Sequence, residues 1–447
     1  MITQAWRVSR RRAMKIAAAT AALPLVHIRT GRAAGKLTIG FWDHWVPEGN
    51  EIMKKQCAAF GAAHQVEVAP DFITSNGSKN ILTIAAEAQA KTGHDIQQFP
   101  EWEVQNHADQ LEPVDDVMQR LTSKYGGVAA ASQYLFNIKG HWRAVPCSSG
   151  NQNKGPCGRI SVLKQAGLDV VKMYPPSADA TPDAENWTYE TMLKVAEACK
   201  KANMAVGIGL GTTADSVDTA GSMFAAFGAE VVSAKGDVNV HTDAVRQVLE
   251  YAQQLVKYLP DDAVSYDDAS NNRALISGKS ALIWNPPSAW AVAKRDAPAV
   301  AADCWTFPAP KGPKGRFLPL GAFSWGIWNF SSNKTAAKEL IEYLSQRENV
   351  EARCKVVQGY DVPPFASMTD FKIWDEVEPP KGTVYHYPIR KSHHQENWIA
   401  VAPAPPEIAV QVYNRGTLPT MLAKLQSGQS IKQVQDWAQD ELEGFVR

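Results

Sequence analysis

Short apolar runs alternate with helix-periodic segments along most of the chain. Runs rich in β-branched and aromatic residues predict strands over residues 37–41, 66–68, 95–99, 281–284 and 325–328. Apolar positions spaced by three or four residues predict amphipathic helices over residues 52–60, 79–90, 192–199, 245–256 and 337–344. Because strands and helices alternate, we expect an α/β fold with largely parallel sheets.

Local signals divide this pattern further. Thr188 and the pair Ser332 and Asn333 are expected to cap the helices that follow them, because their side chains can accept hydrogen bonds from free amide groups. Residues 308–315 and 359–364 are rich in proline and glycine and predict connectors without regular structure. A chain of 447 residues exceeds what one hydrophobic core usually serves, so we expect two domains.

Residues 1–33 predict an export signal that is removed near Ala34. The pair Arg10-Arg11 precedes an apolar run of 11 residues over positions 16–26, and small side chains follow. The paired arginines favour the twin-arginine route, but Ala13 stands where that signal usually has a bulky apolar residue, which leaves the general secretory route open. Because the run is too short to span a bilayer, we expect a soluble protein of the periplasm.

Loss of this segment would leave an acidic protein. The whole chain has 46 Lys and Arg and 46 Asp and Glu, but residues 1–33 hold seven of the basic side chains and no acidic one. Residues 34–447 therefore have a formal charge of −7. Nucleic acids and anionic membranes select dense basic patches, which the sequence lacks, so neither is an expected partner.

Six cysteines suit an oxidising compartment. Cys147 and Cys157 flank a polar, turn-rich loop for which we expect little core of its own. A disulfide between them is our hypothesis, with Cys304 and Cys354 as alternative partners.

No pattern in the sequence points to a metal or a cofactor. Cysteine and histidine lack the clustered spacing of zinc sites. His393 and His394 are adjacent, so in regular structure their side chains point in different directions, and no third ligand accompanies them.

Several short motifs of the sequence resemble motifs of one known family, and they occur in the same order along the chain. Residues 36–42 resemble its opening strand, and residues 109–115 resemble its Gly-x-Leu-x-Pro-Leu-Asp stretch without the glycine. Residues 274–284 resemble its aromatic-Phe-x-x-Gly-Lys-Ala-Ala-Met phrase, with Ala274 and Leu275 in place of the aromatic pair. The chain thus resembles the sugar-binding family of extracellular solute-binding proteins of ABC importers, which includes maltose-binding protein, over nearly its whole length.

This resemblance implies a two-lobe periplasmic-binding-protein fold with three hinge crossings, near Pro146, near Pro319 and near residues 359–363. The first α/β lobe would comprise residues 36–147 plus 320–358, and the second residues 148–318 plus 363–447. A ligand would bind between the lobes, at the carboxyl ends of strands. The implied protein is a monomer without enzymatic activity that closes around a sugar, oligosaccharide or polyol and presents it to the permease subunits of an ABC transporter.

Aromatic and polar residues are interleaved where the predicted strands end. The chain has as many tryptophans as phenylalanines, 14 of each. The apolar face of a pyranose packs on a flat ring, whereas its hydroxyl groups need directional polar partners. We expect Trp284 to stack on the ligand, because it ends a strand before a turn that cannot continue the sheet. The predicted contacts are Trp42, Asp43, His44, Trp45, Ser75, Glu101, Trp102, Trp284, Asn285, Trp290, Phe323 and Tyr360.

Other functions in the same sequence remain open. A binding protein for glycerol phosphodiesters would need a cationic or amide-rich cleft, but the cleft loops contain Asp43 and Glu101 and no arginine. Aromatic rings and carboxylates could instead enclose an amine through cation–π attraction. A carbohydrate hydrolase would need two facing carboxylates, for which Asp43 and Glu101 are candidates, but Gly-x-Ser-x-Gly and His-Glu-x-x-His motifs are missing.

Overall fold

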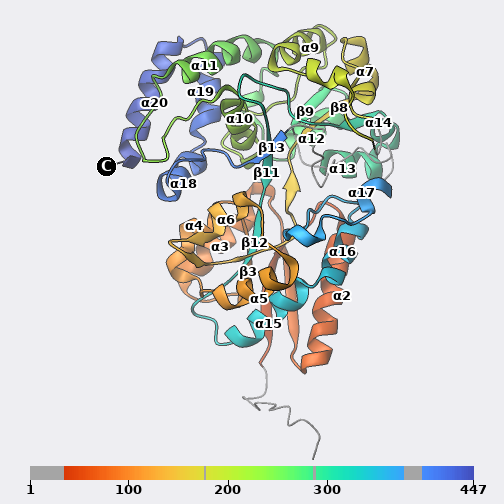
Figure 1. The fold of residues 1–447 in the computed structure, drawn as a ribbon, viewed down its shortest axis with the longest axis vertical. Coiled ribbons are helices and arrows are strands. Elements are labelled where there is room, and N and C mark those ends of the chain that lie inside the picture. Colours follow the sequence, from red (N-terminus) through yellow and green to blue (C-terminus); the bar gives the residue numbers. More distant parts are fainter. Residues whose placement is uncertain (1–34, 176–177, 285–287, 377–394, 447) are drawn as a thin grey trace, which may run out of the picture. The chain divides into compact units, whose positions relative to one another are not determined.

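A five-stranded sheet of order β2-β1-β3-β12-β6 contains the first strands of the chain (Figure 1). Its members are β2 (Val68–Ile73), β1 (Leu37–Trp42), β3 (Ile96–Pro100), β12 (Phe323–Ile327) and β6 (Val145–Pro146). β1 is parallel to β2 and to β3, while β12 is antiparallel to β3 and to β6. Phe323 is paired with Pro100, so β12 begins at the edge of the sheet where β3 ends.

The computed structural model describes residues 35–175, 178–284, 288–376 and 395–446. Residues 36–447 form one compact unit, and the predicted export signal lies outside the described residues. Within the described ranges, no helix combines the length and the apolar character needed to cross a membrane.

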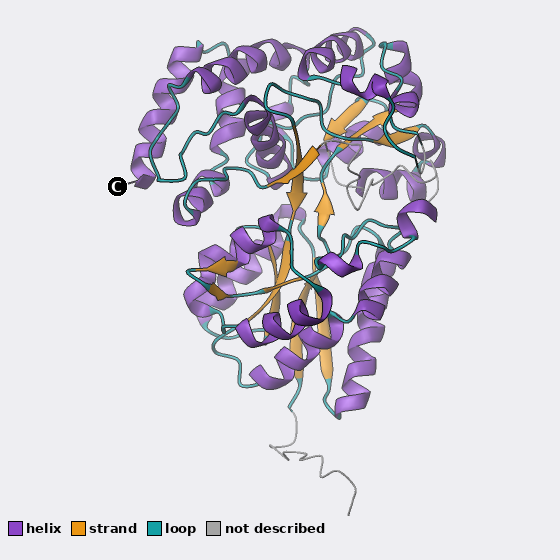
Figure 2. Ribbon diagram, in the orientation of Figure 1, coloured by secondary structure: helices purple, strands orange, loops and turns teal. Residues whose placement is uncertain are grey.

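Helices cover the five-stranded sheet, and Figure 2 shows the strands enclosed among them. α2 (Pro47–His64), α3 (Lys79–Ala90), α5 (Asp115–Tyr125), α15 (Lys334–Leu344) and α16 (Arg347–Val356) belong to this part. α2 buries Met53, Cys57 and Phe60, the face that the apolar periodicity predicts. The predicted cap of α15 is wrong, because Asn333 makes no side-chain cap and donates from Nδ2 to Asp95 at 3.2 Å.

Two three-stranded sheets hold most of the remaining strands. One has the order β13 (Gln395–Trp398), β11 (Arg316–Gly321), β7 (Gln152–Asn153), and the other the order β10 (Cys304–Thr306), β8 (Pro156–Arg159), β9 (Leu282–Trp284). The prediction of largely parallel sheets is wrong here, because β8 is antiparallel to both neighbours and β7 is antiparallel to β11. These strands pair with partners far away in sequence, and strand–helix alternation carries no information about such pairs.

The helices of this second part pack on one another and on the sheets. They are α9 (Tyr189–Lys201), α10 (Ala214–Phe227), α11 (Asp243–Leu255), α18 (Pro406–Asn414), α19 (Thr417–Gln426) and α20 (Ile431–Val446). As predicted, Thr188 caps α9 by accepting a hydrogen bond from the amide of Thr191.

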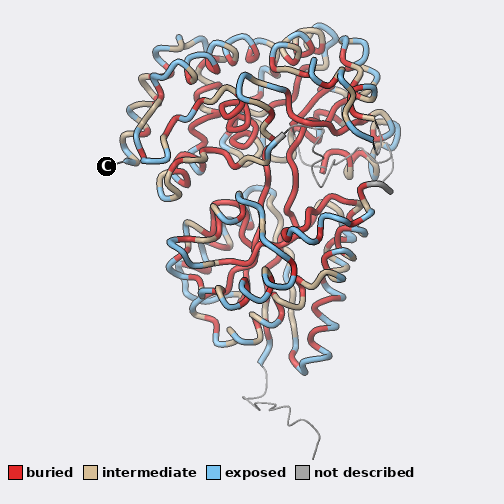
Figure 3. The backbone as a smooth tube through the Cα atoms, viewed as in Figure 1, coloured by how far each residue is buried: buried red, intermediate tan, exposed pale blue. Residues whose placement is uncertain are grey.

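Among the described residues, two short connections join strands of the five-stranded sheet directly to strands of the other sheets. Residues 147–151 lead from β6 to β7, and Ala322 alone separates β11 from β12. The tube in Figure 3 is mainly buried along these central strands. Residues 359–364 have no regular structure, as predicted, and hydrogen bonds of 2.8 and 2.9 Å tie Val362 to Asn151 of the first connection. The lobe boundaries drawn from the sequence remain a prediction.

Candidate ligand-binding site

A cavity of about 520 Å³ lies where β1 and β3 end and β12 begins. Its volume is that of a small-molecule site. The part around the five-stranded sheet contributes Trp42, Trp45, Ser75, Ser78, Asn80, Ile81, Glu101, Trp102, Glu103, Asn106, His107 and Phe323. The second part contributes Gln152, Lys154, Thr212, Thr213, Asp215, Asp268, Ser288, Tyr413 and Asn414.

Aromatic rings form much of this lining. Trp42 ends β1, and its backbone amide donates to Gln98 Oε1 at 3.1 Å. Its ring centroid lies 5.4 Å from that of Phe323, and the rings of Trp102 and Tyr413 are 6.1 Å apart. Glycine at position 150 leaves room for Phe323, because a Cβ there would lie 3.0 Å from the Phe323 ring. Its φ of 79° is also a backbone conformation that favours glycine.

One buried ammonium group organises the polar side of the cavity. Lys154 Nζ lies 2.6 Å from Asp218, 3.4 Å from Glu101 and 3.5 Å from Asp215. The backbone amide of Lys154 donates to the carbonyl of Pro319 in β11 at 2.8 Å. Gly321 is required beside it, since a Cβ there would lie 2.8 Å from Lys154 Cε.

Burial changes the protonation of this cluster. It raises the pKa of Glu101 to about 8 and that of Asp268 to about 6, and it also raises the pKa of Asp218. Burial opposes the charge of Lys154, but Asp218, Glu101 and Asp215 outweigh it and raise the pKa of the ammonium group. Lys154 therefore stays charged, while Glu101 holds its proton at neutral pH in the empty cavity.

Local structure places the acidic residues. Glu101 follows β3 with a φ of 25°, which is unusual for a side chain of its kind, and its amide donates to Ala322 at 2.8 Å. Thr213 caps α10 by accepting from the amide of Ser216, so Asp215 lies in the first turn and Asp218 about one turn from the cap. Carboxylates are favourable at this end of a helix, where the dipole is positive.

Half of the predicted contacts line the cavity: Trp42, Trp45, Ser75, Glu101, Trp102 and Phe323. Ligand contact by these six remains a prediction. Asn285 lies outside the described residues. The five others, Asp43, His44, Trp284, Trp290 and Tyr360, do not line it.

Trp284 is a core residue in this structure and does not line the cavity, and its stacking on ligand stays a prediction. Its side chain is 3% exposed, it pairs with Pro156 in β8, and its carbonyl accepts from Asn271 Nδ2 at 3.1 Å. The carboxyl ends of strands gather at one edge only in parallel sheets, and β9 belongs to an antiparallel one. Trp290 lines a separate cavity of about 230 Å³, which Trp45 also borders.

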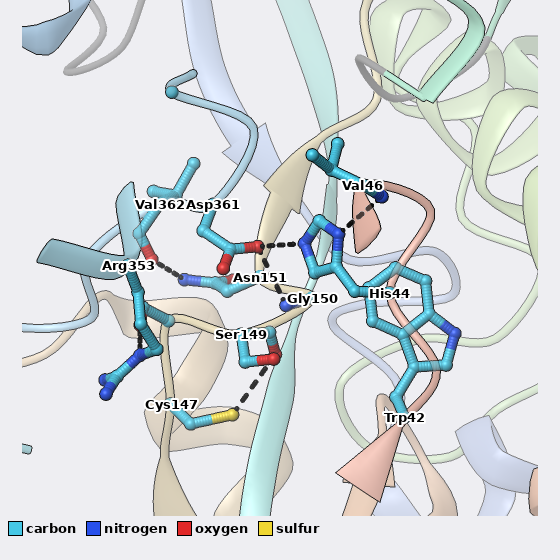
Figure 4. Close-up of polar contacts among 12 residues, drawn as sticks. Trp42, His44, Val46, Cys147, Ser149, Gly150, Asn151, Arg353, Asp361 and Val362 are labelled. Atoms are coloured by element: carbon cyan, nitrogen blue, oxygen red, sulfur yellow. Dashed lines mark hydrogen bonds and ion pairs between the residues drawn. The ribbon is translucent and has the colours of Figure 1, made fainter. Parts of the chain in front are cut away.

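Asp43, His44 and Tyr360 do not line the cavity, and each has another role. Asp43 is exposed and accepts a hydrogen bond from Asn50 Nδ2 at 2.7 Å. His44 Nε2 lies 3.1 Å from Asp361 Oδ1, so this ring nitrogen already has a buried hydrogen-bond partner within the protein (Figure 4). Tyr360 is fully buried, 4.7 Å from the His44 ring.

The disulfide hypothesis is wrong in this structure, where all six cysteines are free and buried. Cys147 follows β6 and its Sγ donates to the carbonyl of Ser149, as Figure 4 shows. Cys157 belongs to β8, in a different sheet. The segment between them does not need a disulfide to hold it in place, because every residue from 148 to 156 is buried.

Within the described ranges, no group of three or more His, Cys, Asp or Glu side chains could hold a metal ion. His393 and His394 lie outside those ranges.

Known proteins resemble this chain in sequence pattern and in fold. A family model for bacterial extracellular solute-binding proteins matches residues 55–379. No curated protein matches the sequence. Three solved structures illustrate the similarity in fold, and all three are below 20% sequence identity.

Maltose-bound T. maritima MalE3 is 18% identical with a TM-score of 0.72 over 92% of this chain and 100% of that one. A chitin oligosaccharide binding protein is 17% identical with a TM-score of 0.72 over 93% of this chain and 100% of that one. A sugar transporter from Arthrobacter chlorophenolicus A6 with bound laminaribiose is 16% identical with a TM-score of 0.69, over 93% and 100%.

These similarities establish the two-lobe α/β fold of periplasmic binding proteins. The family and these neighbours are binding proteins rather than enzymes. Because the family model covers well over half of the sequence, this chain belongs to the bacterial extracellular solute-binding proteins.

Proposed function

We propose that this protein binds a carbohydrate, which is a sugar, an oligosaccharide or a polyol, and delivers it to an ABC transporter. The lining of the 520 Å³ cavity carries the proposal: Trp42, Trp45, Trp102 and Phe323 lie among hydroxyl, amide and carboxyl groups. This combination suits a pyranose, because each ring can cover an apolar sugar face while polar neighbours bond its hydroxyl groups. The neighbours with maltose, a chitin oligosaccharide and laminaribiose in their titles support the same ligand class.

Delivery would depend on closure of the two predicted lobes around the ligand. The lining comes from residues on either side of the connections at 147–151 and Ala322, so rotation about these connections would change the width of the cavity. A ligand that contacts both sides favours the closed form, which the permease subunits would recognise. In this proposal the protein acts as a monomer.

The proposed place of action is the periplasm, after removal of residues 1–33. The paired arginines before a short apolar run support export by the twin-arginine route. The intact mass of protein recovered from the periplasm tests this step, and a product that retains Arg10-Arg11 would contradict it.

The rival functions find less support in the lining. A hydrolase that uses Asp43 and Glu101 is disfavoured, because Asp43 is bonded to Asn50 outside the cavity and Glu101 faces Lys154. A phosphodiester site is disfavoured because the buried ammonium group of Lys154 is already surrounded by carboxylates.

A thermal-shift screen tests the proposal. The panel contains monosaccharides, oligosaccharides, polyols and glycerol phosphodiesters, since a ligand at 100 times its Kd adds about 2.7 kcal/mol to the stability of the native state. We expect a carbohydrate to raise the melting temperature and to reduce the radius of gyration in small-angle scattering. Stabilisation by phosphodiesters alone, or turnover of an oligosaccharide, would contradict the proposal.

A further inference from the structure

The cavity has more carboxyl groups than its own cation can balance. Glu101, Asp215 and Asp218 surround Lys154 Nζ, and Asp218 makes the closest contact, at 2.6 Å. Asp268 is a further carboxyl group in the lining, and its Oδ1 is buried without a hydrogen-bond partner. A single lysine thus faces four acidic side chains.

Two other buried side chains have unused hydrogen-bonding atoms at the same cavity. Trp102 is 1% exposed and its Nε1 has no partner, while Gln152 is 6% exposed and its Oε1 has no partner. Both residues line the cavity. Buried polar atoms normally find partners, and these atoms are available to a ligand in the cavity. Two of the three unused atoms, those of Gln152 and Asp268, are acceptors, which calls for a ligand rich in donors.

The aromatic lining suits the same kind of ligand. Trp42 and Trp45 border the cavity that contains Glu101 and Asp268. The face of an indole ring packs on the apolar face of a sugar, so a cationic substituent of that sugar would bind at the carboxylates. An ammonium group can donate three hydrogen bonds, whereas a sugar hydroxyl can donate one.

We propose that the ligand is a saccharide that carries a protonated amine, and that this amine binds near Asp215 and Asp268. The inference rests on the proposed carbohydrate function and narrows its ligand class. Asp215 and Asp268 line the cavity from the side of α10, whereas the rings of Trp42 and Trp45 line it from the five-stranded sheet. The sugar ring would lie on the indoles, and its amine would face the carboxylates.

The protonation of the site gives this proposal a pH signature. The titratable groups around the cavity are Glu101, Glu103, His107, Lys154, Asp215, Asp218, Asp268 and Tyr413. His107 is paired with Glu103 at 3.6 Å, on the other side of the lining from α10. Because burial raises the pKa of Glu101 and Asp268, an incoming cation favours their ionised forms and displaces protons. Affinity for an amine should therefore rise with pH over the range in which Asp268 and Glu101 ionise, for as long as the amine itself keeps its proton.

Matched pairs of sugars test the proposal. Calorimetry would compare D-glucosamine with D-glucose, D-galactosamine with D-galactose, and β-1,4-linked glucosamine oligosaccharides with their N-acetylated forms. We expect at least one amine to bind about 10- to 100-fold more tightly than its neutral partner, the range for hydrogen bonds to a charged group. Its binding enthalpy should also vary with the ionisation enthalpy of the buffer, which reports proton release.

Variants locate the effect. Asp268→Asn should remove most of the preference for the amine, measured as the ratio of its affinity to that of the neutral partner in the same variant. Asp109→Asn removes an exposed carboxylate that does not line the cavity and should change neither affinity. Melting curves of both variants check that they remain folded.

The outcomes separate the two proposals. If neutral sugars bind as tightly as their amine partners, the amine inference fails and the carbohydrate function stands. If the amine preference survives in Asp268→Asn, the assigned position of the amine is wrong. If no sugar of either kind binds, both proposals fail.

Discussion

His44 Nε2 lies 3.1 Å from Asp361 Oδ1, although the two residues are 317 positions apart in the chain. Both side chains are 2% exposed. The amide of Val46 donates to His44 Nδ1 at 2.9 Å, so in the neutral imidazole the proton is on Nε2 and is donated to Asp361. The same carboxylate oxygen accepts from the amide of Gly150 at 3.0 Å. Asp361 thus joins the loop after β1 to the connection between β6 and β7 (Figure 4).

Replacement of Asp361 by alanine should destabilise the empty protein by about 3 kcal/mol, because two buried donors lose their acceptor. Urea unfolding measures this loss. Asp43→Ala is the matched control, since Asp43 is next to His44 but exposed, and it should change stability by less than about 0.5 kcal/mol. If both variants lose the same free energy of unfolding, the buried hydrogen bonds of Asp361 do not stabilise the protein more than an exposed carboxylate does.

Trp45 and Trp284 should respond to truncation in opposite ways. Trp45→Ala removes a half-buried ring from the cavity lining and should weaken ligand binding about 5- to 150-fold with a small effect on melting. Trp284→Ala leaves a hole in the core and should cost about 3–5 kcal/mol of stability in the absence of ligand. Melting curves and calorimetry on both variants distinguish the roles. Normal stability with abolished binding in Trp284→Ala would restore the sequence-based assignment.

The empty protein should lose stability as the pH rises from about 5 to about 8. The folded state raises the pKa of Glu101 from 4.5 to about 8 by burial, so it binds a proton there that the unfolded chain has released. The stabilisation is complete below the unfolded pKa and disappears as the pH passes the folded one. Glu101→Gln should flatten this dependence in melting experiments across the range. Parallel curves for the two proteins would rule out Glu101 as the cause.

All six thiols should react with an alkylating reagent once the protein is denatured without a reductant. In the native state they should be protected, because the cysteines are buried and burial raises the pKa of Cys57 to about 12 and that of Cys199 to about 11. Intact mass after each treatment counts the adducts. A denatured product without adducts at Cys147 and Cys157 would instead establish the bridge between them.

Elements with a strong local signal could be predicted from the sequence. The helix predicted over residues 79–90 is α3, Lys79–Ala90, and Thr188 caps α9, because periodicity and capping depend on residues close together in the chain. β8 could not be predicted. Its sequence, Pro-Cys-Gly-Arg, has little strand propensity, and pairing with β9 and β10 more than 100 residues away holds it in place.

The candidate site likewise contains residues that could be predicted from the sequence and residues that could not. Trp42, Glu101 and Trp102 follow or end parallel strands, so the topology alone brings them together. Asp215 and Asp268 come from the second part of the chain, and only the tertiary fold brings them to the same cavity. The sequence does contain a feature that could identify Lys154 as a site residue. It is the only charged residue between 144 and 158, in a stretch too polar for an ordinary core. Its polar composition predicts a loop that needs a disulfide, whereas the stretch is buried in the structure.

The contact between Gly321 and Lys154 restricts how this protein can change over time. Gly321 precedes the single residue that separates β11 from β12, pairs with Gln152, and leaves no room for a side chain beside the Lys154 stem. The backbone amide of Lys154 is hydrogen-bonded to Pro319 of the same strand, so a movement of β11 would also move Lys154. A substitution at Lys154 must therefore fit against Gly321 at the end of β11. A substitution at Gly321 must in turn leave room for the side chain of Lys154 in the cavity. A change of ligand preference would be easier at lining positions outside β11 and β12, such as Ser75 and Asn414.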